Sequence, residues 1–393
     1  NQVKNYIKPS LRDLMPNPLK ILDMEKAASR INIAVNNHER IAIFADYDVD
    51  GATSGALLHD WLTQLGNIPT LYVPDRIEEG YGPNIVAMET LANVHDLIIC
   101  VDCGTLSHET INKITNTDII ILDHHLGGET LPNAYAVVNP NRQDEKGDLY
   151  YLCAAGVVFL TLVAANSIRR NNNKSTPDLL NMLDLVALGT VADVAPLIGF
   201  NRALVRQGLK VMAKRERIGI TALSDIAKMN NAPSPYHLGY LLGPRINAGG
   251  RVGKADLGIR LLTCKNYDEA NSIADKLNQL NDERRSIEAT VQIQALEQVE
   301  KMDSNSALAW AAGEGWHPGV VGIVASRIKE ITNKPTVVIG LDEHEGKGSG
   351  RSISGIDLGS SIATLQRENL IIRGGGHKMA AGLSLEREKL EIA

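Results

Sequence analysis

The stretch IAIFADYDVDG, residues 41–51, sets the pattern from which the rest of the fold can be predicted. Five consecutive apolar residues predict a strand that is buried on both of its faces. Three aspartates, Asp46, Asp48 and Asp50, follow at once, before the amphipathic segment SGALLHDWLTQLG. A buried strand that leads into a helix is the unit from which parallel α/β sheets are built.

Apolar runs followed by loops or helical patterns recur from residue 41 to about residue 194. TLYVP, DLIICV and DIIIL are the other predicted strands. Two further helices are expected, from Ala154 to Arg169 and from Pro177 to Leu188. Continuous apolar strands that alternate with helices favour a sheet covered on both faces, so we predict a doubly wound, mostly parallel α/β domain.

The composition of the chain changes in its last third. Residues 267–301 carry apolar side chains at helical spacing among many charges, without glycine or proline, which predicts one long helix. From residue 306 the chain is dense in glycine, and two strands with at least two helices fit a smaller α/β domain. We predict a first domain with an N-terminal extension, a rigid connecting helix and a second domain, over residues 1–265, 266–304 and 305–393.

The bulk composition is that of an ordinary soluble globular protein, with 44% hydrophobic and 22% charged residues among 393. The net charge of −6 gives no support for nucleic-acid binding through overall charge. It does not exclude such binding, because a local basic lining can lie on an acidic protein that also holds metal ions. The chain begins at Asn1 rather than at a methionine, so we expect a fragment of a longer protein.

Neither the apolar segments nor the cysteines point to a membrane or to an oxidising compartment. No signal pattern is visible, and the most apolar stretch, Leu152 to Ala165, is too short to cross a bilayer. Four cysteines in a chain of this length do not form a disulfide framework, which favours a reducing, cytoplasmic location without a membrane partner. Cys100 and Cys103 form a CxxC, for which we expect burial rather than a redox or zinc role.

Carboxylates and imidazoles follow several of the predicted apolar segments. In a parallel α/β sheet the carboxyl ends of the strands meet at one rim, where ligands bind. A cluster of acids at this rim would repel itself unless divalent cations neutralised it, and carboxylates with one or two imidazoles suit Mn²⁺ or Mg²⁺. The residues concerned are Asp46, Asp48, Asp50, Asp102, Asp123, His124, His125 and Asp193.

Each of these residues also has an ordinary structural explanation. An aspartate at a strand end is more often a helix N-cap, and Asp50 before Gly51 suits a turn. The conjunction of four separate segments favours a site instead. Two metal ions need a bridging ligand, which suits Asp102, alone on its strand, and such a pair activates water for displacement at phosphorus. Asp123 is expected to orient a histidine.

Four motifs of the chain, DYDVDG, VDCGT, LDHH and GTVADVAPL, resemble in order and spacing those of the DHH phosphoesterase family. RIEEGYGPN, VVNPNR, GPRINAGGRVG, GSGRSISG and GGGHKMAAG resemble the bacterial members that are single-strand-specific 5′→3′ DNA exonucleases. The resemblance covers nearly the whole chain. It implies a DHH domain, a long connecting helix and a smaller DHHA1 domain, as well as release of 5′-mononucleotides in DNA repair and recombination.

The resemblance also implies roles for the residues at the rim. His125 is similar to the residue that contacts the scissile phosphate and assists the leaving group, with Asp102 as the other catalytic residue. Some relatives place a histidine ahead of the first motif on one metal; Asp46 stands there in this chain, as a ligand or as a partner of one. The expected ligands of two Mn²⁺ or Mg²⁺ ions are Asp48, Asp50, Asp102, His124 and Asp193.

A 5′→3′ exonuclease must find a strand end, and a terminal 5′-phosphate needs cations and amide groups around it. Arg251 in the loop NAGGR, with Ser349 and Arg351 in the loop GSGRS, is expected to hold that phosphate in a cleft between the domains. The run GGGH, residues 374–377, offers successive N–H groups, the kind of nest that binds anions. Further substrate candidates are Gly375, Gly376, His377, Arg76, Tyr81 and, as a helix N-terminal residue, His317.

The partners expected from the resemblance are single-stranded DNA with a 5′ end, a single-strand-binding protein and a RecQ-type helicase. Three other functions stay open. Relatives cleave very short RNAs, cyclic dinucleotides or 3′-phosphoadenosine phosphate, without the INAGGR context. A non-catalytic replication scaffold would have lost metal ligands, whereas all the expected acids are present here. A pyrophosphatase would need more lysines that converge on small phosphates.

Overall fold

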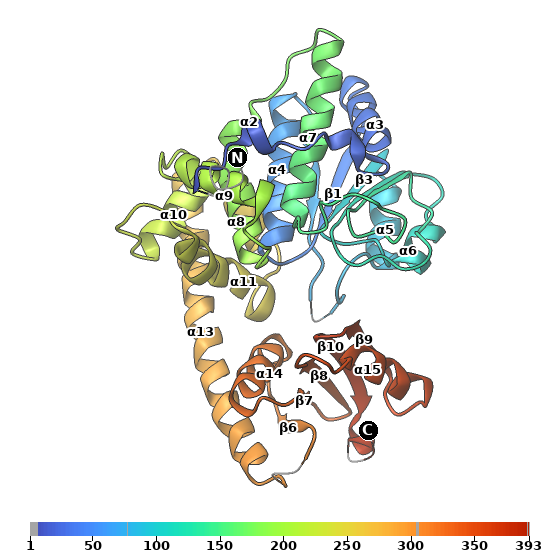
Figure 1. The fold of residues 1–393 in the computed structure, drawn as a ribbon, viewed down its shortest axis with the longest axis vertical. Coiled ribbons are helices and arrows are strands. Elements are labelled where there is room, and N and C mark those ends of the chain that lie inside the picture. The colour runs from blue at the N-terminus through green and yellow to red at the C-terminus, as the bar shows by residue number, and fades with distance from the viewer. Residues whose placement is uncertain (1–6, 77, 304–305, 391, 393) are drawn as a thin grey trace. The chain divides into compact units, whose positions relative to one another are not determined.

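The computed structural model describes residues 7–76, 78–303, 306–390 and 392, and it divides into two compact units after Leu280. The first unit is built around a five-stranded sheet in the order β2-β1-β3-β4-β5, with every neighbouring pair parallel. Figure 1 labels two neighbouring strands of this sheet, β1 and β3. The predicted parallel α/β domain is confirmed. Its strands are β1 (Ile41–Ala45), β2 (Thr70–Tyr72), β3 (Leu97–Val101), β4 (Asp118–Leu122) and β5 (Ala136–Val138).

Helices cover both faces of this sheet, as a doubly wound fold requires. Side chains alternate along β1, so that Ile41 and Ile43 join one core cluster while Ala42 and Phe44 join another. The first cluster includes residues of α3 (Met24–Asn36), α4 (Val49–Gln64) and α7 (Ala154–Asn171), and the second includes residues of α5 (Ile85–Ala92) and α6 (His108–Lys113).

The rest of the first unit is helical, and α8 (Leu183–Ala192) and α12 (Leu257–Thr263) are the elements of this part that pack most closely on α4. The segment predicted as a helix from Pro177 to Leu188 is a 3₁₀ turn, η2, followed by α8. A Cβ atom on Gly189 would lie 2.5 Å from Thr53 Oγ1, so this glycine lets α8 approach the first turns of α4. The remaining elements are α2 (Leu11–Leu14), η1 (Pro18–Lys20), η2 (Leu179–Met182), α8 (Leu183–Ala192), α9 (Gly199–Met212), α10 (Ile218–Ile226), η3 (His237–Leu242), α11 (Gly243–Val252) and α12 (Leu257–Thr263).

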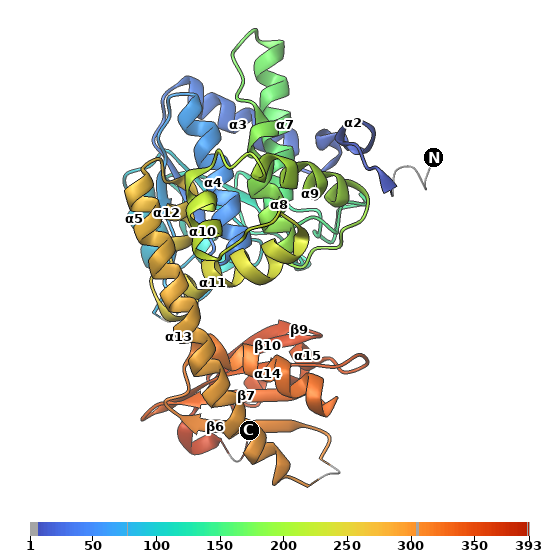
Figure 2. The same ribbon diagram turned by 90° about the vertical axis from the view of Figure 1, so that its left-hand side faces the viewer.

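The predicted long helix exists as α13, Tyr267–Glu300, which is continuous over 34 residues (Figure 2). Its first half belongs to the core of the first unit through Ala270 and Leu277. Its second half packs in the second unit through Val291 and Ala295. The helix is stabilised by packing at both ends, which a charged segment of this length requires.

The second unit is an α/β domain around a sheet in the order β6-β7-β8-β10-β9, in which β6 and β7 are parallel and the other pairs antiparallel. The prediction of two strands was wrong, since five are formed among the described residues. The glycine runs GSGR and GGGH form strands rather than loops. The elements are β6 (Ala309–Glu314), α14 (Pro318–Thr332), β7 (Thr336–Leu341), β8 (Glu345–Arg351), α15 (Leu358–Arg367), β9 (Arg373–His377), β10 (Ala380–Glu386) and η4 (Arg387–Lys389).

Two further expectations concern the apolar and sulfur-containing residues. None of the described helices has both the length and the apolar character needed to span a membrane. Cys100 and Cys103 are buried free thiols, as expected for a CxxC that serves packing. Burial raises the pKa of both thiols above its usual value, so both stay protonated and neither is a reactive thiolate.

Candidate metal centre

The residues predicted to bind metal lie together at one rim of the first unit's sheet. Their ligand atoms form three overlapping groups, and within each group all the atoms lie within 4.8 Å of one another. The groups share Asp102 and His124, so they make one continuous cluster of donors. The three groups are Asp46, Asp48 and Asp102; Asp50, His124 and Asp193; and Asp102, His124 and His125.

The aspartates after β1 reach the cluster because α4 begins there. Asp48 is the N-cap of α4, and its Oδ1 accepts hydrogen bonds from the N–H groups of Asp50 at 2.8 Å and Gly51 at 3.0 Å. A Cβ atom on Gly51 would lie 2.4 Å from the carbonyl oxygen of Asp46, so the turn requires glycine. Asp48 is therefore a helix cap and a donor in the cluster at the same time.

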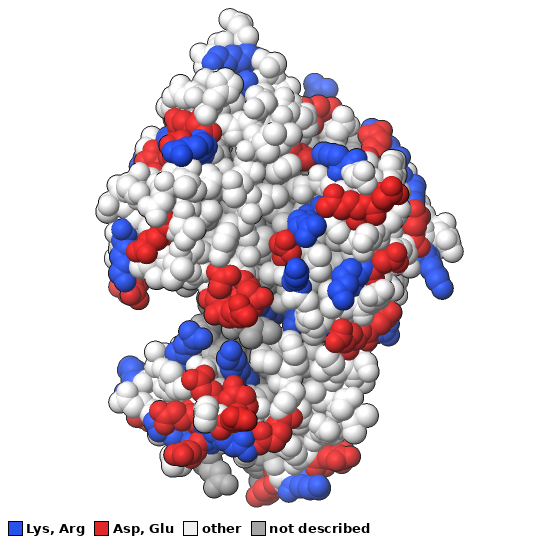
Figure 3. All heavy atoms as spheres, turned by 180° about the vertical axis from the view of Figure 1, so that it is seen from behind, with Lys and Arg blue, Asp and Glu red and all other residues white. Residues whose placement is uncertain are grey.

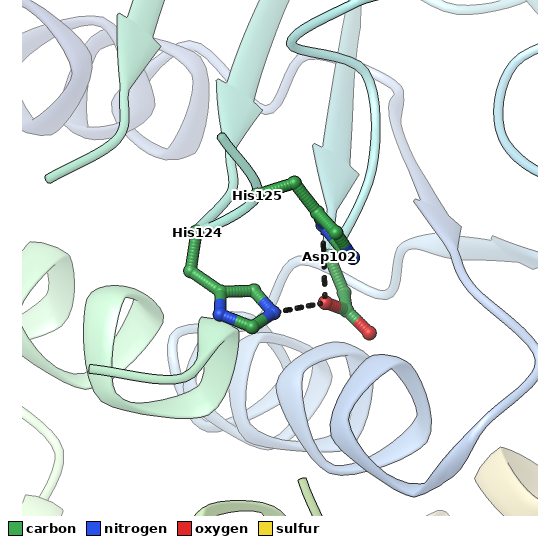
Figure 4. A group of neighbouring side chains, drawn as sticks. All are labelled: Asp102, His124 and His125. Atoms are coloured by element: carbon green, nitrogen blue, oxygen red, sulfur yellow. Dashed lines mark ion pairs between the residues drawn. The ribbon is translucent and has the colours of Figure 1, made fainter. Parts of the chain in front are cut away.

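Asp102 occupies the centre of the cluster. It is 2% exposed, and its φ of +62° lies in the left-handed region, which is strained for a residue with a side chain. Its Oδ1 lies 3.2 Å from His124 Nε2 and 4.0 Å from His125 Nδ1, with both rings turned toward the carboxylate (Figure 4). Among the described residues this oxygen accepts no hydrogen bond, which leaves it available to a cation.

His124 lies between three carboxylates from three different elements. Its Nε2 is 3.8 Å from Asp50 Oδ2, and its Nδ1 is 3.8 Å from Oδ2 of Asp193, which caps the C-terminus of α8. Asp50 is held in turn at the start of α7, where it accepts from Ala154 N at 2.6 Å and Ala155 N at 3.0 Å. The close packing of α4, α7 and α8 therefore positions these donors.

His125 is oriented by Asp123, as the sequence predicts. Asp123 Oδ1 lies 2.8 Å from His125 Nδ1 and accepts from the backbone of His124, while Oδ2 accepts from Thr105 N. Burial alone would lower the pKa of His125. The hydrogen bond and the charge of Asp123, together with the charges of Asp46 and Asp48, outweigh burial and raise this pKa to about 9.

Two asparagines that the sequence reasoning missed hold the backbone of the histidine pair. Asn139, which is fully buried, donates from Nδ2 to the carbonyl oxygen of His125 at 2.8 Å and to Thr105 Oγ1 at 2.9 Å. Asn141 donates from Nδ2 to the carbonyl oxygen of His124 at 2.6 Å. Both follow β5, so the rule of polar residues at strand ends finds them once residues 136–138 are recognised as a strand.

Arg76 and Tyr81, the substrate candidates after β2, lie in the loop that leads to α5. The Tyr81 hydroxyl donates to the carbonyl oxygen of Asp102 at 3.0 Å and lies 3.1 Å from His125 Nδ1, so it is part of the metal centre. The guanidinium of Arg76 lies over the ring of Tyr47, 5.3 Å from its centroid.

The predicted loop around Arg251 was wrong, because this residue lies in the last turn of α11. The glycines before it serve close packing rather than a flexible loop. A Cβ atom on Gly250 would lie 3.0 Å from the carbonyl oxygen of Tyr47. Asn247, also on α11, accepts from the N–H of Val49 at 3.0 Å, so α11 supports the first turn of α4.

In the second unit, Ser349 and Arg351 lie on β8, not in the predicted loop. Arg351 Nη1 donates to Ser349 Oγ at 2.9 Å and to the carbonyl oxygen of Gly350 at 2.8 Å. A Cβ atom on Gly322 would lie 3.0 Å from Ser349 Oγ, so the pair lies against α14. His317 is the N-cap of that helix, as expected, and its Nδ1 accepts from Gly319 N at 3.0 Å.

The predicted anion nest at Gly375, Gly376 and His377 was also wrong. These residues belong to β9, which pairs with β10 in a regular antiparallel register. A nest needs successive N–H groups that converge on one point, whereas those of a strand point alternately to its two sides. The sequence signal was ambiguous because a glycine run has no side-chain pattern that reports strand geometry.

The chain matches the models of known domain families over both units. The model of the DHH family N-terminal domain matches residues 40–190, and that of the DHHA1 domain matches residues 303–393. The single-stranded-DNA-specific exonuclease RecJ of Escherichia coli strain K12 is 40% identical over 391 residues, which span 94% of this chain and 67% of that protein. The chain belongs to the RecJ family.

Solved RecJ structures share the fold of this RecJ-family chain. A crystal structure of exonuclease RecJ bound to manganese has a TM-score of 0.81 at 32% identity, and the match covers 94% of this chain and 91% of that one. RecJ from Thermus thermophilus in complex with Mg²⁺ has a TM-score of 0.74 at 31% identity, covering 95% and 51% of the two chains. Both predicted metals therefore occur in relatives.

The donor set of this RecJ-family chain fits the same two metals. Oδ1 of Asp46 and Oδ1 of Asp102 are buried and accept no hydrogen bond within the described ranges. A buried carboxylate oxygen without a partner is costly unless a cation neutralises it. Carboxylate oxygens with imidazole nitrogens, and without a thiolate, are ligands that suit Mn²⁺ or Mg²⁺.

Without metal, the protein is expected to lose stability as the pH rises from about 5 to about 8. Burial and repulsion by neighbouring aspartates raise the pKa of Asp46, Asp50 and Asp102 above its usual value, and that of Asp193 to about 8. A carboxyl group whose pKa is higher in the folded than in the unfolded protein contributes to the stability of the folded state. This contribution is complete below the unfolded pKa of about 4, and it is lost as the pH rises through the folded pKa.

We expect the free energy of unfolding to fall by an amount on the order of 3 kcal/mol. The measurement is the thermal midpoint of the EDTA-treated protein, which should fall as the pH rises. Mn²⁺ at about 100 times its Kd should add about 2.7 kcal/mol per site at pH 8 and much less at pH 5, because protonated carboxylates bind it weakly. The Asp193→Asn variant should show a shallower slope. A midpoint that is flat or rises with pH in EDTA would contradict this account.

Proposed function

We propose that this RecJ-family chain is a 5′→3′ exonuclease that is specific for single-stranded DNA and releases 5′-mononucleotides. The observation that carries the proposal is the complete set of donors at the rim, in a chain 40% identical to the E. coli exonuclease. A scaffold that had lost catalysis would not be expected to keep a strained, buried Asp102 without a hydrogen-bond partner.

In this proposal, Asp102, His124 and the other aspartates would hold two metal ions. A pair of Mn²⁺ or Mg²⁺ ions would supply an activated water and neutralise the charge that develops on the phosphate. His125, positively charged at neutral pH, contacts the scissile phosphate and passes its proton to the 3′ oxygen that leaves. The remaining ligands are Asp48, Asp50 and Asp193, with Asp46 completing the group around Asp48 and Asp102.

Arg351 and Ser349, on β8 of the second unit, are proposed to bind the terminal 5′-phosphate. Arg251, on α11 of the first unit, is proposed separately as a contact to a phosphate group of the substrate. Arginine holds phosphate with two parallel hydrogen bonds, and the contacts of Arg351 with Ser349 and Gly350 already orient its guanidinium. β9 is an edge strand, so N–H groups on its outer side lie outside the ladder and can add contacts from the 375–377 segment. Arg76 and Tyr81 are proposed to contact the strand near the metals.

We propose a role in DNA repair and recombination in the cytoplasm, with a single-strand-binding protein and a RecQ-type helicase as partners. The helicase would supply the single strand that the nuclease degrades. Basic and acidic side chains are interspersed on the face shown in Figure 3, so overall charge does not recruit DNA. Recognition then depends on local groups, and delivery by partners that bind DNA themselves is consistent with this surface.

The proposed function is tested with Mn²⁺ and a DNA strand that carries a 5′-phosphate and a 3′ label. The strand is supplied alone and annealed as a blunt duplex. Stepwise release of mononucleotides from the 5′ end of the single strand, with the duplex spared, is expected. Cleavage of dinucleotides alone, with the long strand intact, would place the chain among the short-oligonucleotide hydrolases. Hydrolysis of neither would leave only a scaffold.

The Arg351→Ala variant is expected to lose most of the preference for a 5′-phosphate. Removal of a charge-assisted contact to phosphate costs about 1.5–3 kcal/mol, so the ratio of kcat/KM for phosphorylated over hydroxyl ends should fall about 10- to 100-fold. The matched control is Arg367→Ala, an exposed arginine on α15 of the same unit. The assignment fails if the two variants keep the same preference as the parent protein.

A further inference from the structure

Two exposed tyrosines stand side by side on one short helical segment of the first unit. Tyr236 directly precedes the π-helical turn η3, and Tyr240 lies within it. The side chains are 61% and 72% exposed, and their rings stack with centroids 5.2 Å apart at an interplanar angle of 25°. Leu238 and Leu242 of the same turn are fully buried, so the segment is anchored on one side and presents its aromatic rings on the other.

The tyrosine pair lies close to the element that ends in a proposed metal ligand. η3 packs on α8 and α11. A Cβ atom on Gly239 would lie 3.4 Å from Val191, and one on Gly243 would lie 3.4 Å from Ala192. These are the last residues of α8, and Asp193 follows them as its C-cap. The tyrosine pair therefore lies on an element that packs against the end of α8, the helix that Asp193 caps.

The conformation of η3 also marks this segment. π-helical turns are rare and are frequently found at functional sites. Burial of Leu238 and Leu242 explains why the segment is anchored, but it does not explain two large rings in solvent. Isolated exposed aromatic residues are ordinary, whereas a stacked pair offers one extended flat surface.

We propose that Tyr236 and Tyr240 form a stacking platform for bases of single-stranded DNA on the 3′ side of the bond that is hydrolysed. This inference rests on the proposed function and assigns the strand a binding site. Every base has a π face, so stacking is tolerant of sequence, as a nuclease that degrades any strand requires. An acidic chain with a net charge of −6 also gains affinity by stacking that does not depend on cations.

The test compares the Tyr236→Ala/Tyr240→Ala variant with Tyr236→Phe/Tyr240→Phe, which keeps both rings and loses only the hydroxyls. One substrate is a 5′-phosphorylated strand of about 16 nucleotides. The other is a 5′-phosphorylated dinucleotide, which is too short to reach the tyrosine pair while it is bound at the metal centre. The alanine variant should raise KM for the long strand about 10-fold at unchanged kcat, with unchanged kinetics on the dinucleotide. The phenylalanine variant should match the parent protein.

Equilibrium binding of the labelled long strand in EDTA, followed by fluorescence anisotropy, gives a readout that does not require hydrolysis. The alanine variant should bind about 10-fold more weakly, and by the same factor at low and high salt, because stacking releases no counterions. If the parent protein binds in this way but hydrolyses nothing, the proposed function fails and the platform stands. Equal binding and equal KM for all variants, or an equal loss on the dinucleotide, would overturn the platform.

Discussion

Replacement of Asp102 by asparagine is expected to lower kcat about 1,000-fold, which corresponds to roughly 4 kcal/mol of transition-state stabilisation. The side chain lies at the centre of the donor cluster, and its Oδ1 accepts no hydrogen bond from the described residues. The substitution by asparagine therefore breaks no hydrogen bond at this oxygen. Asparagine keeps the shape of the side chain and removes its charge, so the loss of activity reports on the carboxylate at the centre of the cluster. Isothermal titration should show that one of two Mn²⁺ ions is no longer bound tightly.

The same variant should be more stable than the parent protein in EDTA at pH 8. Burial and the nearby aspartates raise the pKa of Asp102 well above its usual value, so its charge destabilises the metal-free fold. A matched control is Asp60→Asn, a buried aspartate on α4 that pairs with Arg217 at 2.7 Å and Lys265 at 3.1 Å. That change should lower the free energy of unfolding by about 3 kcal/mol, because a buried arginine loses a charged partner. The kcat of the folded variant should stay within about twofold of the parent value.

The two variants therefore have opposite expected signatures. Asp102→Asn combines lost activity with gained metal-free stability, and Asp60→Asn combines retained activity with lost stability. If Asp102→Asn retained hydrolysis, or if it unfolded at a lower temperature in EDTA, Asp102 would be a structural residue and not the centre of a metal site.

Most of the donor cluster could be predicted from the sequence because two simple rules coincide there. Apolar runs such as IAIFA and DLIICV identify strands, and parallel strands bring the residues that follow them to one rim. Asp48 fits both the structural and the functional explanation of an aspartate at a strand end. It is the N-cap of α4 and a donor of the cluster, since the cap engages only Oδ1.

The errors arose where glycine was interpreted as a loop. Gly250, before Arg251, allows helix α11 to approach Tyr47, and the glycines of GSGR and GGGH lie in paired strands. Glycine has no side chain, so neither periodicity nor burial pattern can report its structure. What decided these elements was long-range contact: pairing with β10 in one case and packing against the residues after β1 in the other.

Asn139 and Asn141 were missed for a different reason. They follow β5, a strand of three residues that is too short to show a pattern. Their function is also indirect, since they hold the carbonyl oxygens of His125 and His124 rather than facing the donor cluster. Their position after a strand is therefore the one signal that could have found them, and it depends on recognition of β5 as a strand.

Replacement of His125 by glutamine is expected to lower kcat by about 10² to 10⁴ while two Mn²⁺ ions still bind. His125 lies in one group of donors with Asp102 and His124, but its Nδ1 is engaged by Asp123 at 2.8 Å. That contact favours a positively charged ring that binds phosphate over a neutral ring that binds metal. Unchanged Mn²⁺ stoichiometry by isothermal titration, with slow turnover, is the expected combination, and loss of one ion would make His125 a ligand.

The pH dependence separates a proton donor from a residue that only binds phosphate. The carboxylates near His125 raise its pKa to about 9. Bound metal ions would neutralise part of the carboxylate charge and would therefore lower the pKa of His125 toward its usual value. Activity of the parent protein should therefore fall as the pH rises toward 9, because the ring loses the proton that it donates, and the glutamine variant should lack this limb. A substrate with a bridging sulfur in place of the leaving 3′ oxygen needs no protonation. On that substrate the variant should approach the parent rate, and an undiminished defect would show that His125 does not act as the acid.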